Sequence, residues 1–126
     1  MRQALIPGKP IALWIRVFGP SGMREMQALL DTGAAWVTIP PHEAVYLGYD
    51  LGSAPRRKVL GATGVVLAPT IMLPRVSLGE LDASDVPALC LDLPGGLIPA
   101  LLGMSMISRF NVTLDATHRE LRISAP

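Results

Sequence analysis

The chain has 126 residues, of which 50% are hydrophobic and 17% are charged, and its formal net charge is +1. This length is sufficient for a real hydrophobic core but small for two lobes, so we expect one globular domain over residues 1–126. The near-neutral charge gives no reason to expect nucleic acid or an anionic membrane surface as a partner.

The N-terminal part of the chain predicts an extended arm followed by a β-hairpin. The arm covers residues 1–10, and Leu13, Ile15 and Val17 then recur on one face of a strand predicted over residues 11–18. A turn at residues 19–22 leads into a returning strand at residues 24–30. The 12 Gly and 12 Pro are spread through the chain without a period, which suits many short strands joined by tight turns.

A second hairpin is predicted in the middle of the chain, from residues 56–60 and 65–69. Its tip, Gly61-Ala62-Thr63-Gly64, has two glycines that would let a ligand approach closely, although an ordinary hairpin turn explains them equally well. The basic run Arg56-Arg57-Lys58 is interpreted as a solvated edge that discourages aggregation. Residues 42–51, before this hairpin, are expected to form a single helical turn or an irregular loop.

The C-terminal half predicts further strands and one short helix. Strands are expected at residues 71–78 and 84–91, joined by a turn at residues 79–82. A buried strand over residues 98–102 meets Gly103, after which Met104, Ile107 and Phe110 recur at the spacing of a helix. Two closing strands, at residues 111–115 and 120–123, are expected around a turn at residues 116–119.

Neither a metal, a cofactor, a disulfide nor a membrane segment is expected. Cys90 is the single cysteine and is interpreted as a small buried apolar residue, while His42 and His118 stand far apart without ligand-like neighbours. The longest apolar run contains Pro99 and is shorter than the roughly 20 residues of a membrane helix. Localisation stays open between the cytoplasm and, if the chain is a fragment, a membrane anchor located upstream.

The most informative motif is Asp31-Thr32-Gly33, which stands between two apolar segments that predict buried strands. A carboxylate held in an apolar setting is costly unless it has a partner, so Asp31 requires an explanation. A simple hairpin turn is one explanation, because Asp and Gly are common turn residues. The motif alone does not decide between a turn and a functional carboxylate.

The order of three elements adds a resemblance to a known family. Leu29-Leu30-Asp31-Thr32-Gly33-Ala34, a glycine-containing hairpin tip, and Ala100-Leu101-Leu102-Gly103 followed by a short helix together resemble the retroviral-type (retropepsin-like) aspartic proteases, and the bacterial single-domain members look closest. The similarity extends over residues 11–123. Two details depart from the family's usual pattern: Trp36 is bulkier than usual, and the tip has fewer glycines than the viral forms.

This resemblance implies an all-β fold, namely a closed β-barrel with a flap hairpin and one short C-terminal helix. It implies that the apolar strand ending at Gly103 passes behind the motif as the psi-loop, and that the chain is an aspartic endopeptidase acting on proteins or peptides. The implied site residues are the catalytic Asp31, Thr32 and Gly33 and the substrate-binding Ala34, Leu60, Gly61, Ala62, Thr63 and Gly64.

The chemistry of such a site predicts a homodimer. Peptide hydrolysis without a metal or a nucleophilic side chain needs a water activated by one carboxylate and a second carboxyl that can give a proton. Aspartic proteases are the standard case of two close carboxyls sharing one proton. Only Asp31 is followed by Thr-Gly, so the second carboxyl must come from a second copy across a two-fold axis.

The terminal segments are expected to make the dimer contact. Residues 4–6 and 121–123 are short and apolar, and they are expected to leave unpaired strand edges in a lone monomer. Two other functions remain open from the residues alone: a retropepsin-like module that binds peptides or proteins without cutting them, and a purely structural small β-barrel in which Asp31 is only a turn residue.

Overall fold

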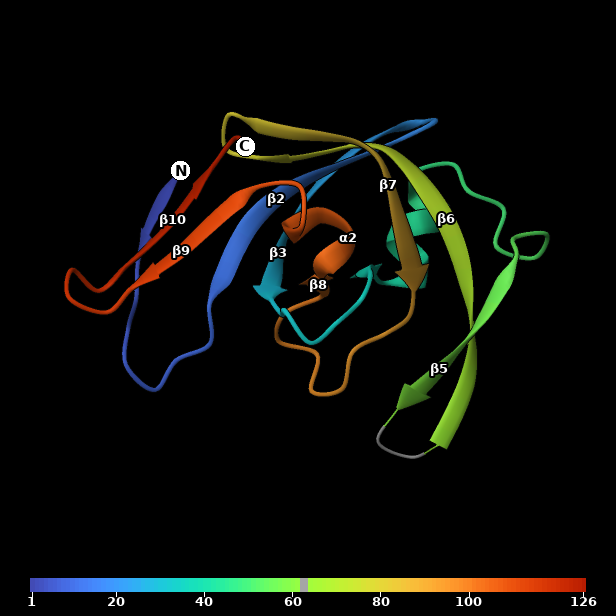
Figure 1. The fold of residues 1–126 in the computed structure, drawn as a ribbon. Coiled ribbons are helices and arrows are strands. Elements are labelled where there is room, and N and C mark those ends of the chain that lie inside the picture. Colours follow the sequence, from blue (N-terminus) through green and yellow to red (C-terminus); the bar gives the residue numbers. More distant parts are fainter. Residues whose placement is uncertain (62–63) are drawn as a thin grey trace.

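The computed structural model describes residues 1–61 and 64–126, which form mainly strands with two short helices (Figure 1). In chain order, the elements are β1 (Arg2–Ala4), β2 (Ala12–Gly19), β3 (Gly22–Leu30), β4 (Val37–Ile39), α1 (Pro41–Tyr46), β5 (Arg56–Gly61), β6 (Gly64–Leu78), β7 (Leu81–Cys90), β8 (Ala100–Leu102), α2 (Met104–Ile107), β9 (Asn111–Asp115) and β10 (Glu120–Ser124).

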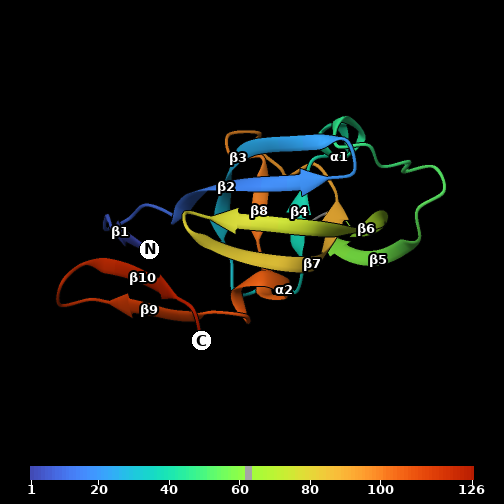
Figure 2. The same cartoon turned by 90° about the horizontal axis from the view of Figure 1, so that it is seen from above.

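The larger sheet closes into the predicted β-barrel. Its strands follow the order β2-β3-β8-β4-β7-β6, and β6 returns to pair with β2, which completes the ring (Figure 2). The first half of β6 extends beyond this ring and pairs with β5, so the β5–β6 hairpin projects from the barrel (Figure 1). The prediction of an all-β closed barrel is therefore confirmed.

The alternation predicted in β2 explains how this strand contributes to the core. Leu13, Ile15 and Val17 are buried, whereas Trp14 between them is exposed. This is the pattern expected for a strand with one face in the barrel interior. The β2–β3 turn is also as predicted, because Gly19 pairs with Gly22 across a two-residue loop.

Two predicted strands prove to be one, because residues 65–69 and 71–78 both belong to the 15-residue strand β6. This strand changes partner near its middle: Pro69 is opposite Arg56 of β5, while Thr70 is opposite Leu89 of β7. The strand therefore remains continuous, and Pro69 marks the change of partner rather than a break.

The structure has a second short helix, α1, in addition to the single C-terminal helix that was predicted. Helix α1 occupies part of the segment expected to be a helical turn or a loop, and Pro41 opens it at a position that tolerates proline. Its buried Glu43 is held by Arg24 of β3 through two hydrogen bonds of 2.8 and 3.1 Å. Helix α2 begins at Met104 as expected but ends at Ile107, so it is shorter than the predicted segment.

The terminal strands correct one expectation. They form a separate sheet in the order β1-β10-β9, so β10 lies in the middle and is paired on both sides (Figure 2). Strand β1 ends at Ala4, and Leu121 and Ile123 of β10 are buried. The expectation of an unpaired edge in a monomer was therefore wrong for residues 121–123, whereas Ala4 lies in β1, which pairs on one side only and is an edge strand of this sheet. The pairing of the two termini extends beyond β1, because backbone groups of Met1 and Leu5 bond to those of Ile123 and Arg119.

A small charged cluster stabilises the β9–β10 turn. Asp115 accepts hydrogen bonds from the His118 backbone at 3.0 Å and from the Arg122 side chain at 2.9 Å, and the His118 ring lies 2.7 Å away. These contacts, led by the backbone bond from His118, lower the pKa of Asp115 to about 2. The ionised form of Asp115 is thus favoured in the folded chain.

Replacing Asp115 by Asn should destabilise the protein in a pH-dependent manner. Because the folded pKa lies below its ordinary value of 3.8, the stabilisation is fully present above about pH 4 and is lost as the pH falls through 2. We expect Asp115→Asn to lower Tm at pH 5 to 7, with a difference that shrinks between pH 4 and 2. Thermal unfolding across this range checks the result, with Asp92→Asn on the exposed β7–β8 loop as control. A pH-independent difference would contradict the linkage.

The remaining singled-out residues behave as ordinary parts of the fold. Cys90 is buried, and burial raises the pKa of its thiol to about 11, which agrees with its interpretation as a small apolar residue. His42 and His118 are both exposed. Of the helices in the described part of the chain, none has the length and apolar character needed to cross a membrane.

Candidate active site

Asp31 lies in a tight turn directly after β3, and it is half-buried. Its side-chain Oδ1 accepts a hydrogen bond of 2.9 Å from the Gly33 backbone N–H, and its carbonyl accepts one of 3.2 Å from Ala34. The backbone N–H of Asp31 donates to the Leu102 carbonyl at 3.1 Å. The carboxylate is therefore fixed by its own turn on one side and by β8 on the other.

Strand β8 runs between the two strands that enter and leave the Asp31 turn. It pairs in parallel with β3 through Leu30 and Leu102, and it pairs with β4 at Thr38 and Leu101. This is the arrangement that the resemblance implied for the strand ending at Gly103. The Asp31 turn is therefore supported from behind by a strand that is paired on both sides.

Gly103 allows the chain to pass closely behind the turn. A Cβ atom on Gly103 would lie against the carbonyl oxygen of Trp36, 2.7 Å from the carbonyl carbon of Trp36 and 2.8 Å from the carbonyl oxygen of Ala34. All three are backbone atoms, so no side chain can move aside to make room. The sequence motif thus requires glycine at this position for steric reasons.

The start of helix α2 is bonded to the loop that follows Asp31. The Met104 and Ser105 backbone N–H groups donate to the carbonyls of Ala34 and Ala35, at 2.8 and 2.9 Å. The Ser105 hydroxyl accepts a 2.9 Å bond from the Val37 N–H and donates to the Pro87 carbonyl at 2.9 Å. Ser105 therefore joins three segments at the site.

The sequence did not single out Ser105. The helical spacing drew attention to apolar residues of α2, whereas Ser105 acts through backbone partners that are distant in sequence. A small polar residue two positions after Gly103 is a weak signal that becomes meaningful only once the fold is known.

Asp31 lines a cavity of about 460 Å³ between the barrel and the β5–β6 hairpin. The barrel side supplies mostly apolar side chains, and the hairpin contributes residues from one strand. The lining residues are Asp31, Gly33, Ala34, Ala35, Trp36, Thr38, Arg57, Lys58, Val59, Leu60, Leu89, Leu91, Leu93 and Leu101. A cleft with an apolar wall and one carboxylate is suited to an extended peptide.

The predicted site residues are brought together only in part. Asp31, Gly33, Ala34 and Leu60 all line this cavity, while Thr32 is exposed beside it. Gly61 and Gly64 face one another at the end of the hairpin. Ala62 and Thr63, which were expected to bind substrate, lie outside the described residues.

Arg57 and Trp36 form a contact that the sequence analysis did not anticipate. The Arg57 guanidinium carbon lies 4.8 Å from the centroid of the Trp36 ring, in the geometry of a cation–π interaction. Arg57 was interpreted as part of a solvated edge, and it is indeed exposed on the edge strand β5, but together with Lys58 it also lines the cavity. The fold, and not the sequence, shows that these two of the three basic residues border the cavity that contains Asp31.

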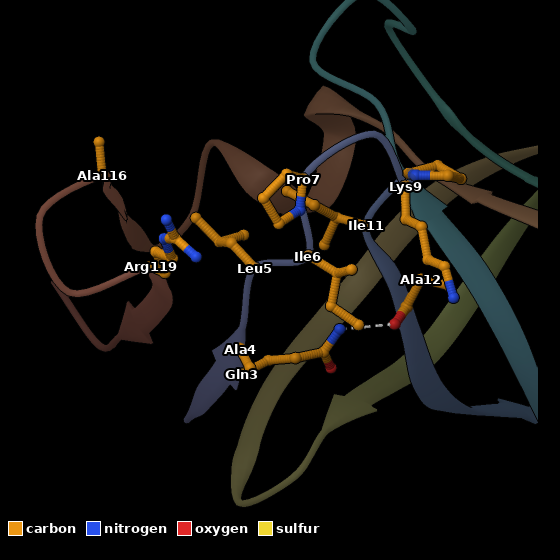
Figure 3. Close-up of a pocket in the computed structure, with 11 residues that line it drawn as sticks. Gln3, Ala4, Leu5, Ile6, Pro7, Lys9, Ile11, Ala12, Ala116 and Arg119 are labelled. Atoms are coloured by element: carbon orange, nitrogen blue, oxygen red, sulfur yellow. Dashed lines mark hydrogen bonds between the residues drawn. The ribbon is translucent and has the colours of Figure 1, made fainter.

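A second hollow, of about 510 Å³, lies away from Asp31 (Figure 3). It is formed where the N-terminal arm bends between β1 and β2, next to the β9–β10 turn, and Leu5, Ile6 and Ile11 lie along it. The Gln3 side chain donates a 2.8 Å bond to the Ala12 carbonyl, which fixes the bend of the arm. The residues that line this hollow include no carboxylate.

Comparisons with known proteins agree with this geometry. The family model described as aspartyl protease matches residues 15–106, a range that contains both the Asp31 turn and the strand ending at Gly103. The chain is also similar to a crystal structure of a retropepsin-like aspartic protease from Rickettsia conorii, with 25% sequence identity and a TM-score of 0.73. The match covers 98% of this chain and 88% of the other. No curated protein sequence matches the chain.

The barrel, with β8 held between the strands that flank an Asp-Thr-Gly turn, defines the retropepsin-like class of fold. The chain belongs to the aspartyl protease family.

Proposed function

We propose that the chain is an aspartic endopeptidase that hydrolyses peptide bonds with a water molecule activated by two copies of Asp31 across a homodimer. The observation that carries this proposal is the half-buried Asp31, which is held by hydrogen bonds with Gly33 and Leu102 and lines a mostly apolar cavity. One carboxylate would activate the water, and the other would give a proton to the leaving amine.

The roles of the neighbouring residues follow from the same geometry. Gly33 has no side chain, so water and the substrate carbonyl can approach the Asp31 carboxylate. Thr32 is exposed at the turn, and its hydroxyl makes no hydrogen bond within the described residues. In the proposed dimer, the two Thr32 hydroxyls would brace the two turns against each other. The β5–β6 hairpin would cover the bound peptide as a flap.

One side of the molecule is suited to pairing with a second copy. The Asp31 turn, the β7–β8 loop, the bend of the N-terminal arm and the β5–β6 hairpin all reach the lower side of the view in Figure 1. Large apolar side chains are exposed there, with Leu97 at 92% and Ile6 at 56% exposure. These side chains would be covered in the proposed pair. Pairing through this side would bring the two Asp31 turns together.

The dimer proposal predicts that specific activity depends on enzyme concentration. One copy has a single Asp31, so a diluted monomer should cleave nothing, and specific activity should rise with the dimer fraction. A peptide library provides the substrate, and sedimentation at the same concentrations gives the oligomeric state. Ile6→Asp should shift both curves to higher concentration, whereas Val45→Asp, on the 59%-exposed Val45 of α1, should shift neither.

Two outcomes would contradict the proposal. Constant specific activity at concentrations where only monomer sediments would contradict the shared site. Absence of cleavage of any library peptide at concentrations where the dimer sediments would contradict proteolysis itself.

A further inference from the structure

The wall of the Asp31 cavity carries a positive charge that is held in place by an aromatic ring. Arg57 projects from β5, and its guanidinium lies over the Trp36 ring at 4.8 Å. Trp36 is half-buried, and its backbone packs against Gly103. The contact with the Trp36 ring favours one position of the Arg57 side chain beside the cavity.

The hydrogen-bond donors of Arg57 remain available. A cation–π contact does not use the N–H groups as donors to an oxygen acceptor, so these groups can still bond to a ligand. Within residues 1–61 and 64–126, no carboxylate is ion-paired with Arg57 or with Lys58 beside it. By contrast, Arg24, Arg75 and Arg122 are each paired with an acidic residue of their own chain.

The rest of the cavity provides no competing anion except Asp31. Leu89, Leu91, Leu93, Leu101 and Val59 make up most of the remaining wall. Arg57 is exposed in the free chain, and a bound peptide would shield its guanidinium from water, which strengthens a charge-assisted hydrogen bond to an anionic group. A Glu side chain has a group for each kind of lining residue: its aliphatic stem would contact the leucines, and its carboxylate would pair with Arg57.

We propose that the cavity selects peptides with an acidic side chain, with Arg57 as the specificity-determining residue and Trp36 as the residue that positions it. This inference rests on the proposed function, since it names the substrate class of the same site. In a homodimer the cavity occurs twice. The acidic preference should therefore appear at two substrate positions, one on each side of the cleaved bond.

The test measures cleavage of matched peptides. A cleaved sequence is varied one position at a time between Glu, Gln and cysteic acid, whose sulfonate stays ionised at acidic pH. At the selected positions, wild-type kcat/KM should be about five- to tenfold higher for the ionised side chain than for Gln, the range of a partly exposed charged contact. In Arg57→Gln most of this preference should be lost, with any remainder due to Lys58, which also lines the cavity, and Arg57→Lys should recover only part of the loss.

The matched control is Arg56→Gln. It removes the same charge from the adjacent position of β5, but Arg56 does not line the cavity, so the preference should remain at its wild-type value. An equal loss in Arg56→Gln and Arg57→Gln would show a general charge effect and would overturn the assignment of Arg57. Wild-type cleavage without any acidic preference would overturn the inference while leaving the proposed proteolysis intact.

A binding measurement separates the inference from catalysis. Asp31→Asn protein, which is expected not to cut, is titrated with the Glu, Gln and cysteic acid peptides, and the same is done with an Asp31→Asn, Arg57→Gln double variant. Tighter binding of the ionised peptides that is lost in the double variant supports the acidic site even if no peptide is ever cleaved. Equal affinity for all three peptides in the single variant overturns it.

Discussion

Asp31→Asn is expected to abolish peptide cleavage while leaving the fold unchanged. An amide can neither take a proton from water nor share one with a second carboxyl, so kcat should fall by about 10³-fold or more. Asn keeps an oxygen at the position of Oδ1, so the 2.9 Å bond from the Gly33 N–H can persist and the turn should hold its shape. Cleavage of the best library peptide, with circular dichroism and thermal unfolding in parallel, measures both effects.

The structure provides a matched control for this substitution. Asp50 makes the same kind of turn contact as Asp31, since its Oδ1 accepts a 3.1 Å bond from the backbone N–H two residues later, at Gly52. Asp50 does not line the cavity, so Asp50→Asn should leave kcat near the wild-type value. If Asp31→Asn retained wild-type cleavage, the catalytic assignment would be wrong. If it lost cleavage only by unfolding, thermal unfolding would reveal this.

Most of the fold could be predicted from the sequence where each strand has a local signal. The alternation of Leu13, Ile15 and Val17 and the Gly-Pro-Ser-Gly turn predicted the first hairpin, and the closing strands around residues 116–119 were also predicted. The errors occurred where tertiary pairing decides. Strand β6 continues through Pro69 because it exchanges β5 for β7 as its partner, and no local pattern reports that exchange.

The candidate site was predicted through its motifs but not through its supporting contacts. Asp31 and Gly103 were identified because their neighbours are unusual in sequence. Ser105 and Arg57 were missed, because the contacts that define them involve Val37, Pro87 and Trp36, which are far from them in the chain. The terminal sheet was misjudged for the same reason: nothing local shows that β10 has a partner on each side.

Gly103→Ala is expected to cause the largest loss of stability of any single methyl addition at the site. The added Cβ would meet the backbone of both Ala34 and Trp36, and these segments are in turn bonded to Met104 and Ser105 of α2. Gly103 has a φ of −92°, so the cost is steric and does not come from backbone conformation. Overpacking typically costs about 1 to 3 kcal/mol, and a clash with backbone atoms belongs at the upper end of this range, which lowers Tm by roughly 10 °C in a chain of this size.

The same substitution should also impair the site in the molecules that remain folded. Moving β8 away from Trp36 would shift the Leu102 carbonyl that holds the Asp31 backbone, so kcat should fall at temperatures well below Tm. Gly52→Ala is the control, because its Cβ would meet only the end of the Asp50 side chain, at 3.3 Å, which can turn aside. Chemical denaturation and peptide cleavage of both variants give the comparison. Equal stability of the two variants would mean that β8 does not pass as closely behind the Asp31 turn as this arrangement requires.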